Sequence, residues 1–201
     1  MEVYFIRHGQ TDGNVAFRHQ HPKTALNEVG WEQGRVLAEE VKKLKPTHII
    51  SSTHLRAVQT ARLMIDCCTD IIPVTHTAFE ELHRPYELIG NRLISKVTIR
   101  YVWGWFFGRM ADGGESYQDF ILRIKEARTY LESLPEDAKV VIVSHSVFIN
   151  IFLEHLCTDK PINFQRAIKR FWKILVLPNA SMVHLQYSTK LKGDCGWKRV
   201  K

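Results

Sequence analysis

The chain has 201 residues, of which 45% are apolar, and it carries a formal net charge of +7. This length and this apolar share suit one compact domain with a core of its own. The positive charge favours anionic partners such as phosphate esters, nucleic acid or a membrane surface. The most apolar stretch, residues 101–107, is too short to span a bilayer.

Short β-rich runs alternate with longer helical patterns along the chain. Because strand and helix alternate, we expect an α/β fold in which helices cover both faces of a mostly parallel central sheet. The expected strands are residues 2–7, 47–51, 70–75, 139–143, 174–177 and 182–187, and the expected helices are residues 28–44, 55–66, 116–134 and 147–156.

The cysteines and the amino terminus indicate in which cellular compartment the protein is found. Cys67, Cys68, Cys157 and Cys195 show no C-x-x-C spacing, so neither a disulfide framework nor a zinc site is predicted. The terminus lacks a basic region followed by a longer apolar one, so no secretory signal is predicted. We therefore expect reduced, structural thiols in a cytoplasmic protein.

Arginine and histidine side chains follow three of the expected strands. The first strand ends in Arg7 and His8, the second is followed by Arg56 on the next helix, and residues 139–143 run into His145. The carboxyl ends of parallel strands lie at one edge of an α/β sheet, where ligands bind. Cationic groups packed together are costly unless an anion neutralises them, so the sequence predicts an anion site at this edge.

A phosphoryl group matches such a site. The planar guanidinium of arginine fits phosphoryl oxygens and stays charged at any working pH. Helix N-termini after the strands add backbone N–H donors, and a neutral imidazole is an adequate nucleophile. Stabilising charge on the phosphoryl oxygens is then the main task of the remaining residues.

Five motifs carry a family resemblance and span nearly the whole chain, in the order RHGQT (7–11), ALNEVGWEQG (25–34), SSTHLRAVQTA (51–61), GES (114–116) and SHS (144–146). Together they resemble the histidine phosphatase superfamily, also called the phosphoglycerate mutase-like family. The resemblance implies a three-layer α/β sandwich, a single domain over residues 1–201, and a variable lid inserted at about residues 82–114.

The resemblance also implies roles for the residues that match its motifs. His8 would be the nucleophile that becomes phosphohistidine. Arg7, Arg56 and His145 would hold the phosphoryl oxygens.

Three further positions are implied as substrate contacts. Asn14 matches an asparagine that often joins this pocket, although a loop asparagine favoured by backbone geometry is an alternative. Thr11 and the backbone N–H of Ser146 are further expected contacts.

The proton for the leaving group requires a carboxyl group near the pocket. The family places a glutamate in a loop after the third strand, and in the stretch TAFEELHRP the match is Glu81. Glu80 stays open as an alternative. Neighbours in an extended segment point to opposite sides, so only one of the two is expected to face the pocket.

The expected lid contains cationic and aromatic residues. Arg84, with His83 and Arg92, is expected either to hold a second anionic group of the substrate or to be exposed. The aromatic side chains of residues 101–107 are expected to pack as lid core, with an apolar pocket wall or a membrane or partner contact as alternatives.

The leading functional hypothesis is a metal-independent phosphomonoester hydrolase acting on a small-molecule phosphate ester. A cofactor-dependent phosphoglycerate mutase is the alternative, although the stretch ELHRPYELIGNR replaces the ERHYG of such mutases. A non-catalytic phosphate-binding protein ranks lower, and no nucleic-acid-binding signature is present. No cofactor and no metal are expected, and the sequence identifies neither the physiological substrate nor the oligomeric state.

Overall fold

The computed structural model describes residues 1–68, 71–106, 113–158, 177–190 and 195–200, with only the backbone for residues 66–68 and 106. Within these residues one six-stranded sheet is formed by β1 Glu2–Arg7, β2 His48–Ser51, β3 Val74–Thr75, β4 Lys139–Ser144, β5 Met182–Tyr187 and β6 Trp197–Arg199. The helices are α1 Asp12–Val15, α2 Glu28–Leu44, α3 Leu55–Cys68, α4 Lys96–Phe106, α5 Tyr117–Glu132 and α6 Ser146–Glu154, with 3-10 turns η1 Thr77–Phe79 and η2 Tyr86–Leu88.

The sheet is mostly parallel, which confirms the predicted fold class. Its strand order is β3-β2-β4-β1-β5-β6, in which the first four strands are parallel and β5 and β6 are antiparallel. The register places Arg7 beside Ser144, and Ser51 beside Val143. The polar residues that follow β1, β2 and β4 therefore start from one edge of the sheet, as parallel strands require.

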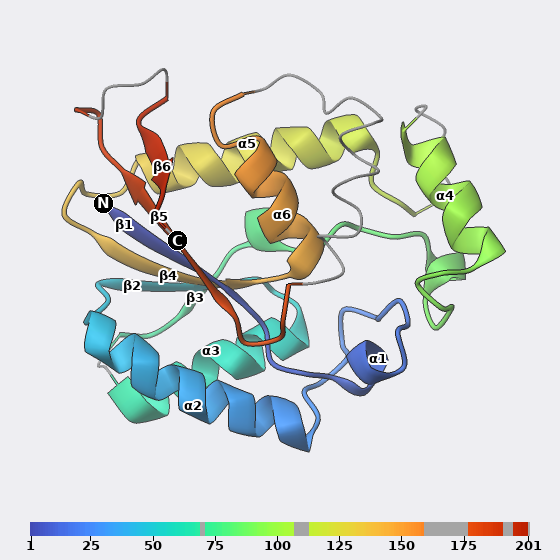
Figure 1. Ribbon diagram of the computed structural model, residues 1–201, viewed down its shortest axis with the longest axis horizontal. Helices are drawn as coiled ribbons and strands as arrows, with labels where there is room; N and C mark the ends of the chain where they lie inside the picture. Colours follow the sequence, from blue (N-terminus) through green and yellow to red (C-terminus); the bar gives the residue numbers. More distant parts are fainter. Residues whose placement is uncertain (69–70, 107–112, 159–176, 191–194, 201) are drawn as a thin grey trace.

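Helices cover both faces of the sheet. Figure 1 shows α2 and α3 on one side and α5 and α6 on the other. Successive side chains of a strand point to opposite faces, and β1 divides accordingly: Val3 and Phe5 join the core under α5 and α6, whereas Tyr4 and Ile6 join the core under α2 and α3. Burial on both faces explains why β4 is a continuous β-branched run.

The predicted boundaries differ most at the sheet edges. The expected strand 70–75 is reduced to β3, whose two residues are both exposed at the edge of the sheet. Residues 174–176 of another expected strand lie outside the described part of the chain. The basic tail supplies β6, which pairs antiparallel with β5. Helix and strand ends elsewhere agree within about two residues, the usual uncertainty of such boundaries.

The aromatic stretch of the expected lid lies on α4. Trp105 is buried, donates its indole N–H to the carbonyl of Glu115 at 3.0 Å, and packs edge-on against Tyr117. Trp105 is thus core, as predicted. Trp103 is exposed, whereas the Phe106 side chain and Phe107 lie outside the described residues.

Two glycines let the loop after β1 pack against the start of α2. A Cβ at Gly9 would lie 2.5 Å from the carbonyl oxygen of Gly30, and a Cβ at Gly30 would lie 2.1 Å from that of Gln10. Hydrogen bonds reinforce the contact, because the Asn27 N–H donates to the Gln10 carbonyl and the Gln10 N–H donates to the Gln33 side chain. The ALNEVGWEQG motif therefore supports the loop that carries His8.

Substituting Gly30→Ala should reduce the free energy of unfolding by about 1–3 kcal/mol, because the new methyl group meets rigid backbone. Gly34→Ala in the same helix is the matched control, since its methyl group meets only the Leu63 side chain, which can move. Urea denaturation of both variants measures the difference. Equal stabilities would contradict the packing argument, because both substitutions gain the same helix propensity.

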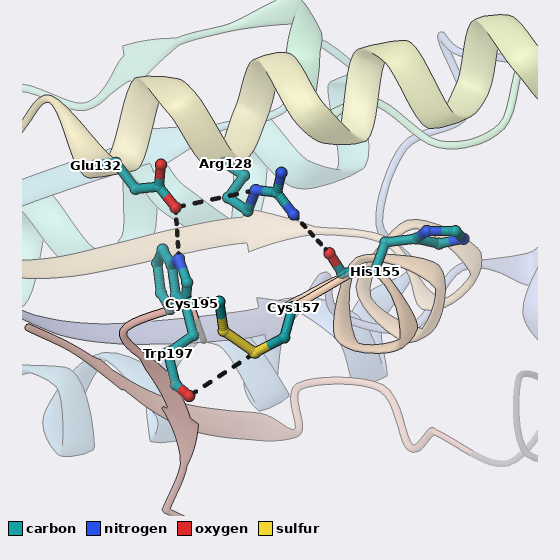
Figure 2. The surroundings of a disulfide bond; sticks show 6 residues. All are labelled: Arg128, Glu132, His155, Cys157, Cys195 and Trp197. Atoms are coloured by element: carbon teal, nitrogen blue, oxygen red, sulfur yellow. Dashed lines mark hydrogen bonds and ion pairs between the residues drawn. A yellow bond between two sulfur atoms is a disulfide. The ribbon is translucent and has the colours of Figure 1, made fainter. Parts of the chain in front are cut away.

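A disulfide joins Cys157 and Cys195, so the expectation of reduced thiols was wrong for this pair. The bond links the segment after α6 to the approach to β6, across 38 residues of sequence. Figure 2 shows its surroundings: the Trp197 indole N–H donates to Glu132 of α5 at 2.7 Å, and Arg128 donates to the His155 carbonyl. Cysteine spacing could not reveal the pair, because the two positions lie 38 residues apart in segments that meet only in the folded chain.

We expect thiol titration of the denatured, unreduced chain to detect two of its four cysteines. Reduction should expose all four and lower the free energy of unfolding by about 2–4 kcal/mol, because a long loop is no longer closed in the unfolded chain. The double variant Cys157→Ser/Cys195→Ser should match the reduced protein in stability. Four thiols without reduction would show that the bond does not form.

Candidate active site

A cavity of about 390 Å³ opens at the carboxyl edge of the parallel strands. It collects residues from β1 and the following loop, from α3, from the start of α6 and from residues 81–93. Its lining consists of Arg7, His8, Gln10, Asn14, Val15, Phe17, Arg18, Gln20, Arg56, Glu81, Arg84, Leu93, Ser146, Val147 and Asn179. The structure thus brings together most of the predicted site residues.

Hydrogen bonds define the tautomer of His8. Its Nδ1 lies 2.7 Å from the carbonyl oxygen of Gly9, which can only accept, so Nδ1 carries the hydrogen. Its Nε2 accepts from Arg56 Nε at 3.2 Å, because a guanidinium can only donate. Burial, and secondarily the charges of Arg56 and Arg7, hold the pKa of His8 well below its usual range. His8 is therefore neutral, and Nε2 is its unprotonated nitrogen, whose lone pair accepts the N–H of Arg56.

Arg56 is a buried cation whose partners are all neutral. Its guanidinium donates to His8, to the His21 carbonyl at 3.1 Å and to Nδ1 of His54 at 3.2 Å. Burial lowers the pKa of Arg56 to about 10, so it stays charged at neutral pH. Arg7 donates to the Leu177 carbonyl. Within the described residues neither arginine lies within 4.0 Å of a carboxylate, which favours an anionic ligand.

His145 follows β4 and is fully buried behind the cavity. Its Nε2 lies 2.7 Å from Oγ of Ser52, and its Nδ1 has no hydrogen-bond partner among the described residues. Its ring lies 5.1 Å from the ring of His8 and 4.8 Å from that of His54. Burial, followed by the charge of Arg56, also lowers the pKa of His145 well below its usual range.

The two candidate glutamates point in different directions. Glu81 is buried and lines the cavity, where its carboxylate accepts from the backbone N–H of Phe148 at 3.1 Å, in the first turn of α6. Glu80 instead contacts Thr53 and lies 2.6 Å from Nε2 of His83. Although burial opposes the shift, hydrogen bonds from His83 and Thr53 lower the pKa of Glu80 to about 2. The geometry favours Glu81 as the carboxyl group of this cavity.

The remaining predicted contacts divide between the cavity wall and its support. Asn14, Ser146 and Arg84 line the cavity. Nη2 of Arg84 lies 4.0 Å from Oε2 of Glu81. Thr11 does not line it: it is fully buried and caps α1, accepting from the Asn14 N–H at 3.2 Å. Its structural position is therefore that of a support for Asn14.

Several neighbours were missed at the sequence level. Asn179 donates to the His8 carbonyl and to Oδ1 of Asn14, both at 3.1 Å, but in the sequence it was only part of a turn. Oγ of Ser52 lies 2.7 Å from Nε2 of His145. His19 is buried, and its Nε2 lies 3.0 Å from Oγ1 of Thr98. These roles depend on distant segments, so local sequence gave no signal for them.

A second cavity of about 230 Å³ shares Gln20, Arg56, Glu81 and Arg84 with the first. The imidazoles of His19, His54 and His83 line it, and no described group of three His, Cys, Asp or Glu residues is arranged to hold a metal ion. No helix in the described part of the chain is long and apolar enough to cross a membrane.

Comparison with known proteins finds one family across the chain. A family profile described as "Histidine phosphatase superfamily (branch 1)" matches residues 3–192. A protein of Yersinia pestis (strain Pestoides F) named "Probable phosphoglycerate mutase GpmB" is 29% identical over 98% of this chain and 90% of its own length.

Solved structures give the same fold. A mycobacterial glucosyl-3-phosphoglycerate phosphatase in complex with VO3 is 26% identical, with a TM-score of 0.75 over 100% of this chain and 97% of its own. YhfR of Bacillus stearothermophilus, at 21% identity, has a TM-score of 0.74 over 99% of this chain and 95% of its own, a likeness of fold alone.

Four buried histidines make the stability of the protein depend on pH. Burial is the main cause that lowers the pKa of His19 and of His54 to about 3, and the pKa values of His8 and His145 are lowered as well. These side chains stay neutral in the folded state but bind protons in the unfolded state below about pH 6.5. Their contribution to stability is therefore present above that pH and is lost as the pH falls.

Between about pH 7.5 and about pH 5.5, we expect the free energy of unfolding to fall by on the order of 1 kcal/mol for each such histidine. Urea denaturation at several pH values measures the slope. His19→Gln should reduce the slope, because one proton-binding group of the unfolded chain is gone. A stability that rises on acidification over this window would contradict the assignment.

Proposed function

Because the chain belongs to the histidine phosphatase superfamily, branch 1, we propose that it hydrolyses small-molecule phosphate monoesters through a phosphohistidine formed on His8. One observation carries the proposal: Nε2 of a neutral His8 accepts from a buried arginine inside a cavity that holds further cations. When Arg56 turns its N–H groups from His8 to the oxygens of a bound phosphoryl group, the lone pair of Nε2 becomes free to attack, so substrate binding itself activates the nucleophile.

In the first step, Arg7 and Arg56 bind the phosphoryl oxygens and Nε2 of His8 attacks phosphorus. The bond between phosphorus and the ester oxygen breaks, and its electron pair stays on the leaving oxygen. Glu81 gives that oxygen a proton, so the alcohol departs neutral. The arginines stabilise the charge on the equatorial oxygens, which is the main catalytic task in phosphoryl transfer.

In the second step, water attacks the phosphohistidine. Glu81, now a carboxylate, takes a proton from the water, the phosphorus–nitrogen bond breaks, and its electron pair returns to Nε2. Inorganic phosphate leaves and the starting state is restored. The His145 ring lies 5.1 Å from that of His8, and its Nδ1 has no hydrogen-bond partner in the described part of the chain; we assign to it, to Asn14 and to the Ser146 N–H further contacts with phosphoryl oxygens.

The mutase alternative rests on the name of the Yersinia relative. A mutase returns the phosphoryl group from His8 to a second hydroxyl, so it must keep water out at that stage. The phosphatase structure with VO3 favours hydrolysis instead. Both reactions use the same first step, and the fate of the phosphohistidine separates them.

We expect the wild-type protein to release phosphate from p-nitrophenyl phosphate with EDTA present. His8→Ala should lose at least about a thousandfold in kcat, because no other group can form the covalent intermediate. Glu81→Gln should lose at least about a hundredfold, and more for an alkyl ester than for the p-nitrophenyl ester, whose leaving group needs no proton.

His48→Asn is the matched control for His8→Ala and should keep the wild-type kcat, since His48 begins β2, at the end of that strand far from the site. A direct second readout is to quench the reaction in alkaline denaturant and detect phosphohistidine, which is stable in alkali and lost in acid. If phosphate is not released but 3-phosphoglycerate is isomerised, the protein is a mutase. If His8→Ala keeps full activity, the phosphohistidine route is wrong.

A further inference from the structure

We infer that the substrate's alcohol carries an apolar ring, bound by an apolar wall formed by Val15, Phe17 and Leu93 at the mouth of the catalytic cavity. This inference rests on the proposed function, because the wall receives the leaving group of the ester that His8 attacks. All three side chains line the same cavity as His8 and Arg56. The wall therefore continues the phosphoryl site instead of forming a separate groove.

The wall is apolar surface that the fold does not bury. Phe17 is 70% exposed and Val15 is 58% exposed, although both lie in the loop region that follows the buried His8. Leu93 is half-buried beside them. Isolated exposed apolar residues are ordinary, but three that line one side of a catalytic cavity form a binding surface for an apolar group.

Phe17 is held in a backbone conformation that bulky residues rarely adopt. Its φ of +50° lies in the left-handed region, where asparagine or glycine is usual. Its N–H donates to the Asn14 carbonyl at 3.2 Å, which closes the turn after α1. An aromatic ring kept at such a position, and exposed there, indicates a functional use of the side chain.

The wall is also rigidly placed. The Leu93 N–H donates to the Phe17 carbonyl at 2.7 Å, and two further backbone hydrogen bonds of 2.9 Å join His19 to Gly90 and Asn91. Arg18 and Arg92 form an antiparallel bridge between the same two segments. This clip couples the loop that follows the nucleophile to the segment that carries Leu93, so the wall keeps its position relative to His8.

The cavity is lined by charged and polar side chains around His8 and by apolar side chains at Val15, Phe17 and Leu93. The floor supplies Arg7, His8 and Arg56 for the phosphoryl group, and Glu81 for the departing oxygen. Beyond the departing oxygen, an alcohol that carries a ring reaches an aromatic and two aliphatic side chains. Ring stacking on Phe17 adds to the burial of apolar area and favours such esters over small polar ones.

The test compares 2-phenylethyl phosphate with ethyl phosphate, since both leaving groups are alkyl alcohols and differ mainly in the ring. We expect kcat/KM for the phenylethyl ester to exceed that for ethyl phosphate by about threefold to tenfold. Phe17→Gly suits the positive φ and should bring this ratio close to one. Ile94→Ala removes an exposed apolar side chain outside the cavity and should leave the ratio unchanged.

A binding measurement separates this inference from the proposed function. His8→Ala cannot form the phosphohistidine, so calorimetry with this variant measures affinity for intact esters. It should bind 2-phenylethyl phosphate at least about threefold more tightly than ethyl phosphate, and adding Phe17→Gly should remove the difference. Phosphate release with equal rates and affinities for the two esters, or a preference for 3-phosphoglycerate, would overturn the apolar wall while leaving the hydrolase intact. Tighter binding of the phenylethyl ester without any phosphate release would uphold the wall and contradict the hydrolase.

Discussion

The structure depends on one buried cation, the guanidinium of Arg56, whose hydrogen-bond partners among the described residues are all neutral. Together with the bond from Nδ1 to the Gly9 carbonyl, its hydrogen bond to Nε2 of His8 selects the tautomer of that ring. Burial, followed by the charge of Arg56, lowers the pKa of His54 and of His145 and keeps both imidazoles neutral. In the described part of the chain this cation has no carboxylate within 4.0 Å, and a buried cation of this kind favours an anionic ligand.

The rest of the fold holds this arrangement in place. The parallel register of β1 and β4 brings the residues after both strands to one edge, and the contact between Gly9 and Gly30 fixes the loop in between. Asn179 ties the His8 carbonyl to Asn14, while the first turn of α6 holds the Glu81 carboxylate. Side chains that backbone contacts already hold in place lose little entropy when a ligand binds.

The centre and the rim of the cavity contribute differently to the proposed function: the centre to the chemical step, the rim to the choice of substrate. The centre, formed by Arg7, His8, Arg56 and Glu81, is the part of the cavity on which the proposed first step depends, and that step is the same for a phosphatase and a mutase. The rim is built from residues 15–20 and 84–93, which differ in chemistry from the centre: Phe17 and Leu93 are apolar, whereas Arg84 is charged. Selection among substrates is therefore expected from the rim, where the leaving group lies.

The sequence alone predicted most of the strands and helices, the mostly parallel sheet, and the meeting of Arg7, His8 and Arg56 at one edge of it. It could do so because period-two and helical patterns are local, and because polar residues after parallel strands must meet at one edge. Only the tertiary structure shows that Glu81 lines the cavity whereas Glu80 lies against His83, since adjacent residues differ in direction and not in type. It also paired Cys157 with Cys195, buried His19, and placed Asn179 and Phe17 at the cavity. These outcomes depend on contacts between segments far apart in the chain, and no local pattern records which distant segments will meet.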